Sequence, residues 1–144
     1  MTNTWVVTAD ASRARIFSVQ GKEHHLREIA DLLNPEGRAS ERELTSDAQG
    51  RYSGRGERMQ GHSAGETSAV GHLNEAFSRE VGRYLEKARA EHQFDRLVLV
   101  APPRFLGLLR QSLSEGVQRA VTEELGKDLS WLDTRDIERH IAKS

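Results

Sequence analysis

Residues 97–110 read LVLVAPPRFLGLLR, and this stretch decides the fold. The run from Leu97 to Ala101 is apolar without alternation, which is typical of a strand covered on both faces. Pro102 and Pro103 end the strand and open a helix, because proline at the first helical position loses no backbone hydrogen bond. The stretch therefore predicts a buried strand followed by a helix. The buried side of that helix is predicted to consist of Phe105, Leu106, Leu108, Leu109 and Leu113.

Three short apolar runs upstream predict strands over residues 4–10, 14–20 and 24–33. Helix is the alternative for the third run, because its apolar residues have helical spacing: Leu26, Ile29, Leu32 and Leu33. Two preceding strands joined by tight turns favour a three-stranded meander, and we predict a strand there.

The elements after residue 66 alternate between helix and strand. A long helix is predicted from Thr67 or Ser68 to about His92, on an apolar stripe of Val70, Leu73, Phe77, Val81, Leu85 and Ala88. After the segment 97–110, a strand is predicted over Val117–Leu125 and a short helix from about Thr134. Together these elements predict one α/β domain over residues 1–144, with a mixed five-stranded sheet flanked by helices.

Composition excludes several classes of function. The chain has 144 residues, a formal charge of −1 and no cysteine, so disulfides, zinc ribbons and thiol chemistry are excluded. Neither a secretory signal nor an apolar run of about 20 residues is present, which favours a cytoplasmic domain without membrane association. No cofactor is expected, because no Gly-Lys-Ser/Thr phosphate loop occurs.

Residues 34–68 lack both helical and strand periodicity, and within them residues 49–61 read QGRYSGRGERMQG. A loop of this length in a small domain is usually functional or disordered. Arg51, Arg55 and Arg58 can contact phosphate, and Tyr52 can stack on a base, as in a loop that binds structured RNA. A solvated insertion without a ligand is the alternative.

Other polar residues give weaker signals. Arg104, near the start of a helix that follows a buried strand, is a candidate for contact with a ligand or anion. Asp10, after the first strand, is predicted to cap the amides of a turn rather than to bind magnesium. No metal site is predicted, because His24 and His25 would point to opposite faces of a strand and no helical histidine pair occurs.

Four segments together resemble the bacterial host-attachment protein family: VVTADASRARIF, HLNEAFSREVGRYLEKA, LVLVAPPRFLGLLRQSL and KDLSWLD. That family is similar in turn to the central domain of archaeal and eukaryotic class-one peptide release factors. The resemblance implies a ribonuclease H-like fold, in which a long loop before the long helix enters the ribosome and promotes peptidyl-tRNA hydrolysis. The Gly-Gly-Gln motif of release factors is absent here, and Gln60 after Met59 is its nearest counterpart.

The sequence and the resemblance predict an RNA- or ribosome-associated domain that acts through Arg51, Tyr52, Arg55 and Arg58. Gln60 is the candidate catalytic residue if the protein hydrolyses peptidyl-tRNA. A role in ribosome rescue is one form of this hypothesis, and recognition of a DNA sequence is not expected. The alternative is a non-enzymatic protein-interaction module with an indirect role in attachment to host cells. A homodimer through an exposed edge strand is also expected.

Overall fold

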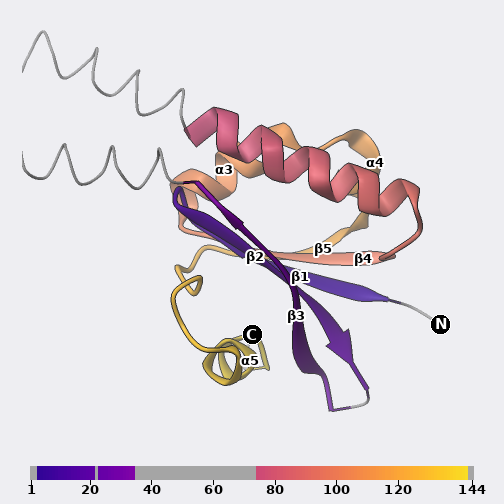
Figure 1. Ribbon diagram of the computed structural model, residues 1–144, viewed down its shortest axis with the longest axis vertical. Helices are drawn as coiled ribbons and strands as arrows, with labels where there is room; N and C mark the ends of the chain where they lie inside the picture. Colours follow the sequence, from indigo (N-terminus) through magenta and orange to yellow (C-terminus); the bar gives the residue numbers. More distant parts are fainter. Residues whose placement is uncertain (1–2, 22, 35–73, 143–144) are drawn as a thin grey trace, which may run out of the picture.

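The computed structural model describes residues 3–21, 23–34 and 74–142. Most of the predicted loop over residues 34–68 therefore lies outside the described residues, and only Asn34 belongs to them. The described residues form a sheet with helices on both of its faces (Figure 1).

One five-stranded sheet has the strand order β3-β2-β1-β4-β5. The strands β1, β2 and β3 form an antiparallel meander, whereas β1, β4 and β5 are parallel. This arrangement confirms the predicted mixed sheet, and β1 is its central strand. The bounds of the five strands are Thr4–Ala9, Arg13–Gln20, His25–Leu33, Arg96–Val100 and Val121–Leu125.

The third strand forms although its apolar residues have helical spacing, and an irregularity in its pairing explains why. Ile16 pairs with Ala30 whereas Phe17 pairs with Glu28, so Ile29 has no counterpart on β2. The extra residue shifts the alternation of side chains along β3. Leu26 and Leu32 consequently pack against opposite faces of the sheet.

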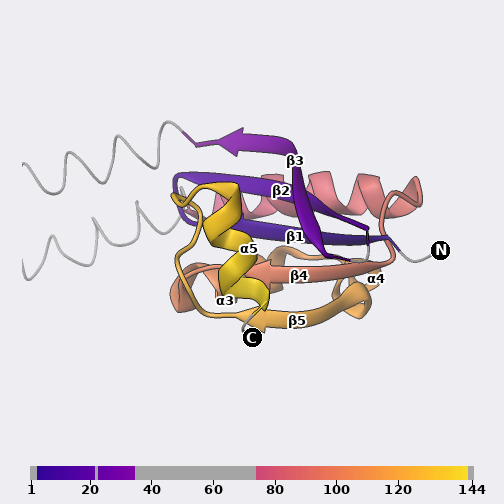
Figure 2. The ribbon, with the colours of Figure 1, turned by 90° about the horizontal axis from the view of Figure 1, so that it is seen from below.

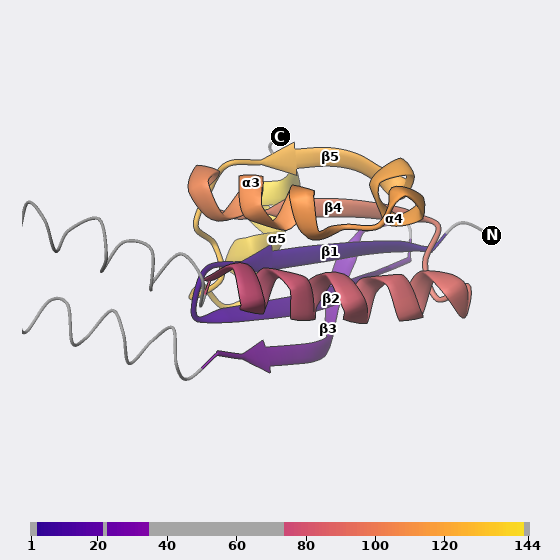
Figure 3. The same ribbon diagram turned by 90° about the horizontal axis from the view of Figure 1, so that it is seen from above.

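Two apolar clusters cover the two faces of the sheet. The helix over residues 74–90, α3 (Pro103–Ser112) and α4 (Glu115–Ala120) lie on one face, and α5 (Thr134–Ala142) lies on the other (Figures 2 and 3). Strand β4 contributes Leu97 and Leu99 to the first cluster and Val98 and Val100 to the second. The structure thus confirms that this continuously apolar strand is covered on both faces.

The predicted strand over Val117–Leu125 was wrong in its first half. Residues Glu115–Ala120 form α4, and only Val121–Leu125 form β5. Ser114 caps α4, because its hydroxyl accepts a hydrogen bond from the amide of Val117 at 3.2 Å. The side chain of Val117 then packs into the core from a helix rather than from a strand.

The helix over residues 74–90 approaches α3 closely at Gly82. A Cβ atom on Gly82 would lie 2.5 Å from the carbonyl oxygen of Ser112, so any other residue would force the two helices apart. The hydroxyls of Ser78 and Ser112 lie 2.7 Å apart beside this contact. These two helices therefore pack as one layer over the sheet.

Candidate functional site

Five of the six predicted site residues lie outside the described residues: Arg51, Tyr52, Arg55, Arg58 and Gln60. The structure nevertheless describes both flanks of this segment. Strand β3 leads into it, and the helix over residues 74–90 follows it. Both flanks lie at the edge of the sheet where β1 and β4 end, beside the turn between β1 and β2 (Figures 1 and 3). We refer to this edge as the carboxyl edge.

Asn34 fastens the end of β3 to the β1–β2 turn. Its backbone amide donates a hydrogen bond to the carbonyl of Ser12 at 2.8 Å, and its side-chain amide donates to the carbonyl of Ala11 at 2.9 Å. These two bonds fix the position at which the chain leaves the sheet.

Arg104, the sixth predicted residue, lies in the first turn of α3, directly after the carboxyl end of β4. Its side chain is exposed, and within the described residues it makes no ion pair with a carboxylate. The first turn of α3 contains no acidic residue either. At the carboxyl edge there is therefore a cation, Arg104, that pairs with no carboxylate of residues 3–21, 23–34 or 74–142.

The carboxylate of Asp10 holds the β1–β2 turn together. Its Oδ1 accepts hydrogen bonds from the backbone amides of Ser12 at 2.7 Å and Arg13 at 2.9 Å. Its Oδ2 accepts from the hydroxyl of Ser130 at 3.1 Å and from the indole of Trp131 at 2.5 Å. The predicted capping role of Asp10 is confirmed, and the same carboxylate also ties the turn to the loop before α5.

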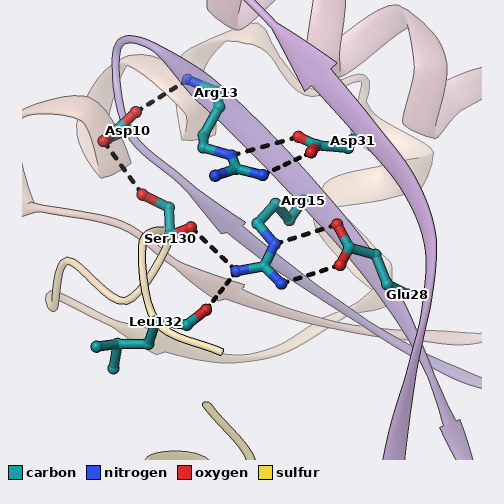
Figure 4. A network of polar contacts seen from close by, with 7 residues as sticks. All are labelled: Asp10, Arg13, Arg15, Glu28, Asp31, Ser130 and Leu132. Atoms are coloured by element: carbon teal, nitrogen blue, oxygen red, sulfur yellow. Dashed lines mark hydrogen bonds and ion pairs between the residues drawn. The ribbon is translucent and has the colours of Figure 1, made fainter. Parts of the chain in front are cut away.

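Arg15, on β2, connects this strand to β3 and to the loop before α5 (Figure 4). Its guanidinium binds both carboxylate oxygens of Glu28, at 3.1 and 2.9 Å, and also donates to the carbonyls of Ser130 and Leu132. Arg15 is only 8% exposed, and its guanidinium lies 5.1 Å from the ring centroid of Phe17. Sequence reasoning missed this network, although an arginine inside the apolar strand ARIF was a signal for it.

Arg13 extends this network toward the protein surface. Its guanidinium pairs with Asp31 at 2.5 Å (Figure 4). It also lies 5.0 Å from the ring centroid of Trp131. The Trp131 side chain is held by this stacking and by Asp10, yet the residue is 51% exposed. A network of ion pairs and hydrogen bonds therefore connects β2, β3, the β1–β2 turn and the loop before α5 at the carboxyl edge.

His25 belongs to the opposite end of the sheet. Its ring nitrogens lie 2.8 Å from Glu23 Oε2 and 3.5 Å from Glu138 Oε1, and these two carboxylates raise the pKa of His25 above its ordinary value. The backbone amide of Leu26 donates to Glu138 and lowers the pKa of that carboxyl. Among residues 3–21, 23–34 and 74–142, no group of three or more histidine or acidic side chains is arranged to hold a metal.

Comparisons with known proteins bear on the whole chain. Residues 5–141 match a family described as "Protein required for attachment to host cells". A curated relative, "Uncharacterized protein RP470" of Rickettsia prowazekii (strain Madrid E), is 35% identical over 66 residues, which are 44% of this chain and 44% of the relative. A solved structure titled "Archaeal protein" has a TM-score of 0.45 and 8% identity, over 98% of this chain and 40% of that chain. No helix in the described part of the chain could cross a membrane.

Proposed function

The chain belongs to the family of proteins required for attachment to host cells, and from that premise we propose that it is a cytoplasmic domain that binds ribosomal or other structured RNA. Its part in attachment is then indirect, through the RNA that it binds. The RNA contacts are assigned to Arg51, Arg55 and Arg58, with Tyr52 as a base-stacking residue.

The observation that carries the proposal is that the two flanks of residues 35–73 lie at the same end of the sheet, at the carboxyl edge (Figure 1). Asn34 fastens one flank to the β1–β2 turn, and Asp10 fastens that turn to the loop before α5. A segment held at both ends, with the basic stretch of residues 49–61 inside it, loses less conformational entropy on binding than a free tail does. Arg104 adds a cation at the same edge.

We also propose that the fold is ribonuclease H-like, of the type found in the release-factor central domain. The order of elements, a three-stranded meander followed by alternating helices and strands, supports this assignment. Gln60 is then the candidate for a role in peptidyl-tRNA hydrolysis. Because the chain lacks Gly-Gly-Gln, RNA binding does not imply peptidyl-tRNA hydrolysis. The two activities therefore require separate experiments.

The test of RNA binding is co-sedimentation of the purified full-length protein with ribosomes, at about 50 mM and about 200 mM salt. We compare the native protein with the variant in which Arg51, Arg55 and Arg58 are all alanine. At low salt a larger fraction of the native protein than of the variant should sediment with ribosomes. The logarithm of the binding constant, plotted against the logarithm of the salt concentration, should have a slope less steep by about 2–3 in the variant, because three phosphate contacts are lost.

The matched control replaces three exposed cations away from the carboxyl edge, Arg83, Lys87 and Arg119, with alanine. This control removes the same charge and should retain binding. Equal loss in both triple variants would assign the effect to net charge and refute the proposed contacts. For hydrolysis, Gln60→Ala should abolish release of peptide from peptidyl-tRNA while leaving sedimentation unchanged; release that persists in the variant excludes Gln60.

A second function, protein binding, is favoured by apolar side chains on the surface. Ile29 and Leu33 on the edge strand β3 are 40% and 63% exposed, and Trp131 is 51% exposed. A partner, including a second copy of the chain, could pair with this strand. Such binding would depend little on salt. Loss of an interaction in Leu33→Lys, with RNA binding intact, would support this function over the first.

A further inference from the structure

A groove lies on the α5 face of the sheet, at the end opposite to the carboxyl edge. Figure 2 shows α5 crossing the sheet near the ends of β1 and β4, with the strands continuing beyond it toward their amino ends. The groove there has a volume of about 580 Å³ and is lined by all five strands and α5. Ligand pockets for small molecules commonly have about 300–1,000 Å³.

The floor of the groove is aliphatic. Val6 and Val98 are paired neighbours on the parallel strands β1 and β4, and Val19 and Leu26 are paired neighbours on β2 and β3. Ile141 of α5 forms the wall on the helix side. Because side chains alternate along a strand, the side chains of these residues lie on the same face of the sheet, the face that α5 covers. Val6 and Val98 are 1% and 7% exposed, so most of the accessible apolar surface in the groove belongs to Val19, Leu26 and Ile141.

The rim of the groove contains polar groups, and most of its charges are already paired. His25 lies between Glu23 and Glu138, and Arg139 pairs with Asp136 at 3.0 Å. Arg96 differs from them, because its guanidinium has no carboxylate partner within the described residues. Thr4 and Arg96 are register partners on the neighbouring strands β1 and β4, and both line the groove.

We propose that this groove binds a small amphiphilic anion, with its apolar body on the valine floor and its anionic group on Arg96. The volume suits a small molecule. An aliphatic floor favours an apolar body, since the burial of apolar surface is favourable in proportion to its area. The guanidinium selects an anion because hydrogen bonds between charged groups are stronger than neutral ones. The site is separate from the proposed RNA contacts and does not depend on them.

The probes are octanoate, 1-octanol and octylammonium, which share an eight-carbon chain and differ in charge. Isothermal titration of the full-length protein should rank them in that order, with octanoate binding about tenfold more tightly than 1-octanol. Arg96→Met keeps the aliphatic stem and removes the charge, and should make octanoate and 1-octanol equal. Arg119→Met, an exposed position on α4 that is absent from the groove lining, is the matched control and should bind like the native protein.

Thr122→Trp fills the groove from an exposed position on β5 and should abolish the binding of all three probes. Circular dichroism verifies that each variant is folded before titration. The proposal is refuted if octanoate does not bind, if its binding survives Thr122→Trp, or if Arg96→Met leaves its preference over 1-octanol unchanged. Light scattering adds one further outcome: a native dimer that Thr122→Trp converts to a monomer would assign the groove to a second copy and overturn the proposal.

Discussion

Replacing Arg15 with methionine tests whether the buried guanidinium holds the loop before α5 onto the sheet. The native side chain satisfies four acceptor atoms, two on Glu28 and one each on the carbonyls of Ser130 and Leu132. Methionine keeps most of the aliphatic volume against Phe17 and supplies no donor. The variant therefore isolates the loss of these hydrogen bonds from a loss of packing.

The loss in the free energy of unfolding depends on how well water can solvate each acceptor once the guanidinium is removed. The Glu28 side chain is 30% exposed, so its carboxylate can be rehydrated and losing the ion pair costs about 1 kcal/mol. Ser130 is fully buried, and a buried carbonyl left without a donor costs about 1–3 kcal/mol. With a similar but smaller term for Leu132, the free energy of unfolding should fall by about 3–5 kcal/mol.

Urea unfolding followed by far-ultraviolet circular dichroism measures this difference, provided that the slope with denaturant is unchanged. Arg13→Met is the matched control, because Arg13 pairs with Asp31 nearer the surface, with side chains 20% and 38% exposed. It should cost about 1 kcal/mol or less. A loss below about 1 kcal/mol for Arg15→Met, or equal losses in the two variants, would refute the reasoning that burial makes this contact strong.

Three further predictions concern other positions. Thr8→Val should raise the free energy of unfolding by about 1 kcal/mol, because the buried hydroxyl of Thr8 has no hydrogen-bond partner in the described structure. His92→Gly should stabilise by about 1 kcal/mol, because His92 follows the end of a helix with a φ of 60°, whereas Lys87→Gly inside that helix should cost about 1 kcal/mol. The raised pKa of His25 adds stability below its ordinary pKa of 6.5 that is lost as pH rises through the folded value. His25→Gln should therefore lower the melting temperature at pH 5.5 more than at pH 8.

The strand with a continuous apolar run was predictable from the sequence. The segment before β5 shows where the hydrophobic pattern does not determine secondary structure. The continuous run Leu97–Val100 identified the buried parallel strand correctly, because burial on both faces removes alternation. Residues 117–120 were predicted as part of a strand, but they belong to α4, which depends on the cap at Ser114 and on packing of Val117 from a helical turn. A segment this short does not distinguish the two structures by periodicity.

The candidate site was predictable only in part, because its contacts depend on pairing register. Asp10 after a strand predicted a capped turn, which the structure confirms. Asp31 lies opposite Arg15 in the strand pairing, as it would in a regular hairpin. The guanidinium of Arg15 nevertheless binds Glu28 and not Asp31. The unpaired residue Ile29 brings Glu28 to the same face of the sheet, and no sequence pattern specifies that irregularity. The arginines of residues 51–58 lie outside the described residues, and their role stays a prediction.

The contacts of Arg15 also set an order of events during synthesis of the chain. Its carbonyl acceptors lie 115 and 117 residues downstream, so they are made long after the arginine itself. At about 5–20 residues per second, a ribosome needs roughly 6–23 s to bridge that interval. Throughout it the hairpin of β2 and β3 carries a cation matched only by Glu28. The loop before α5 therefore docks as a late step, after the sheet has assembled. During this interval a chaperone that recognises exposed apolar strands can bind the chain.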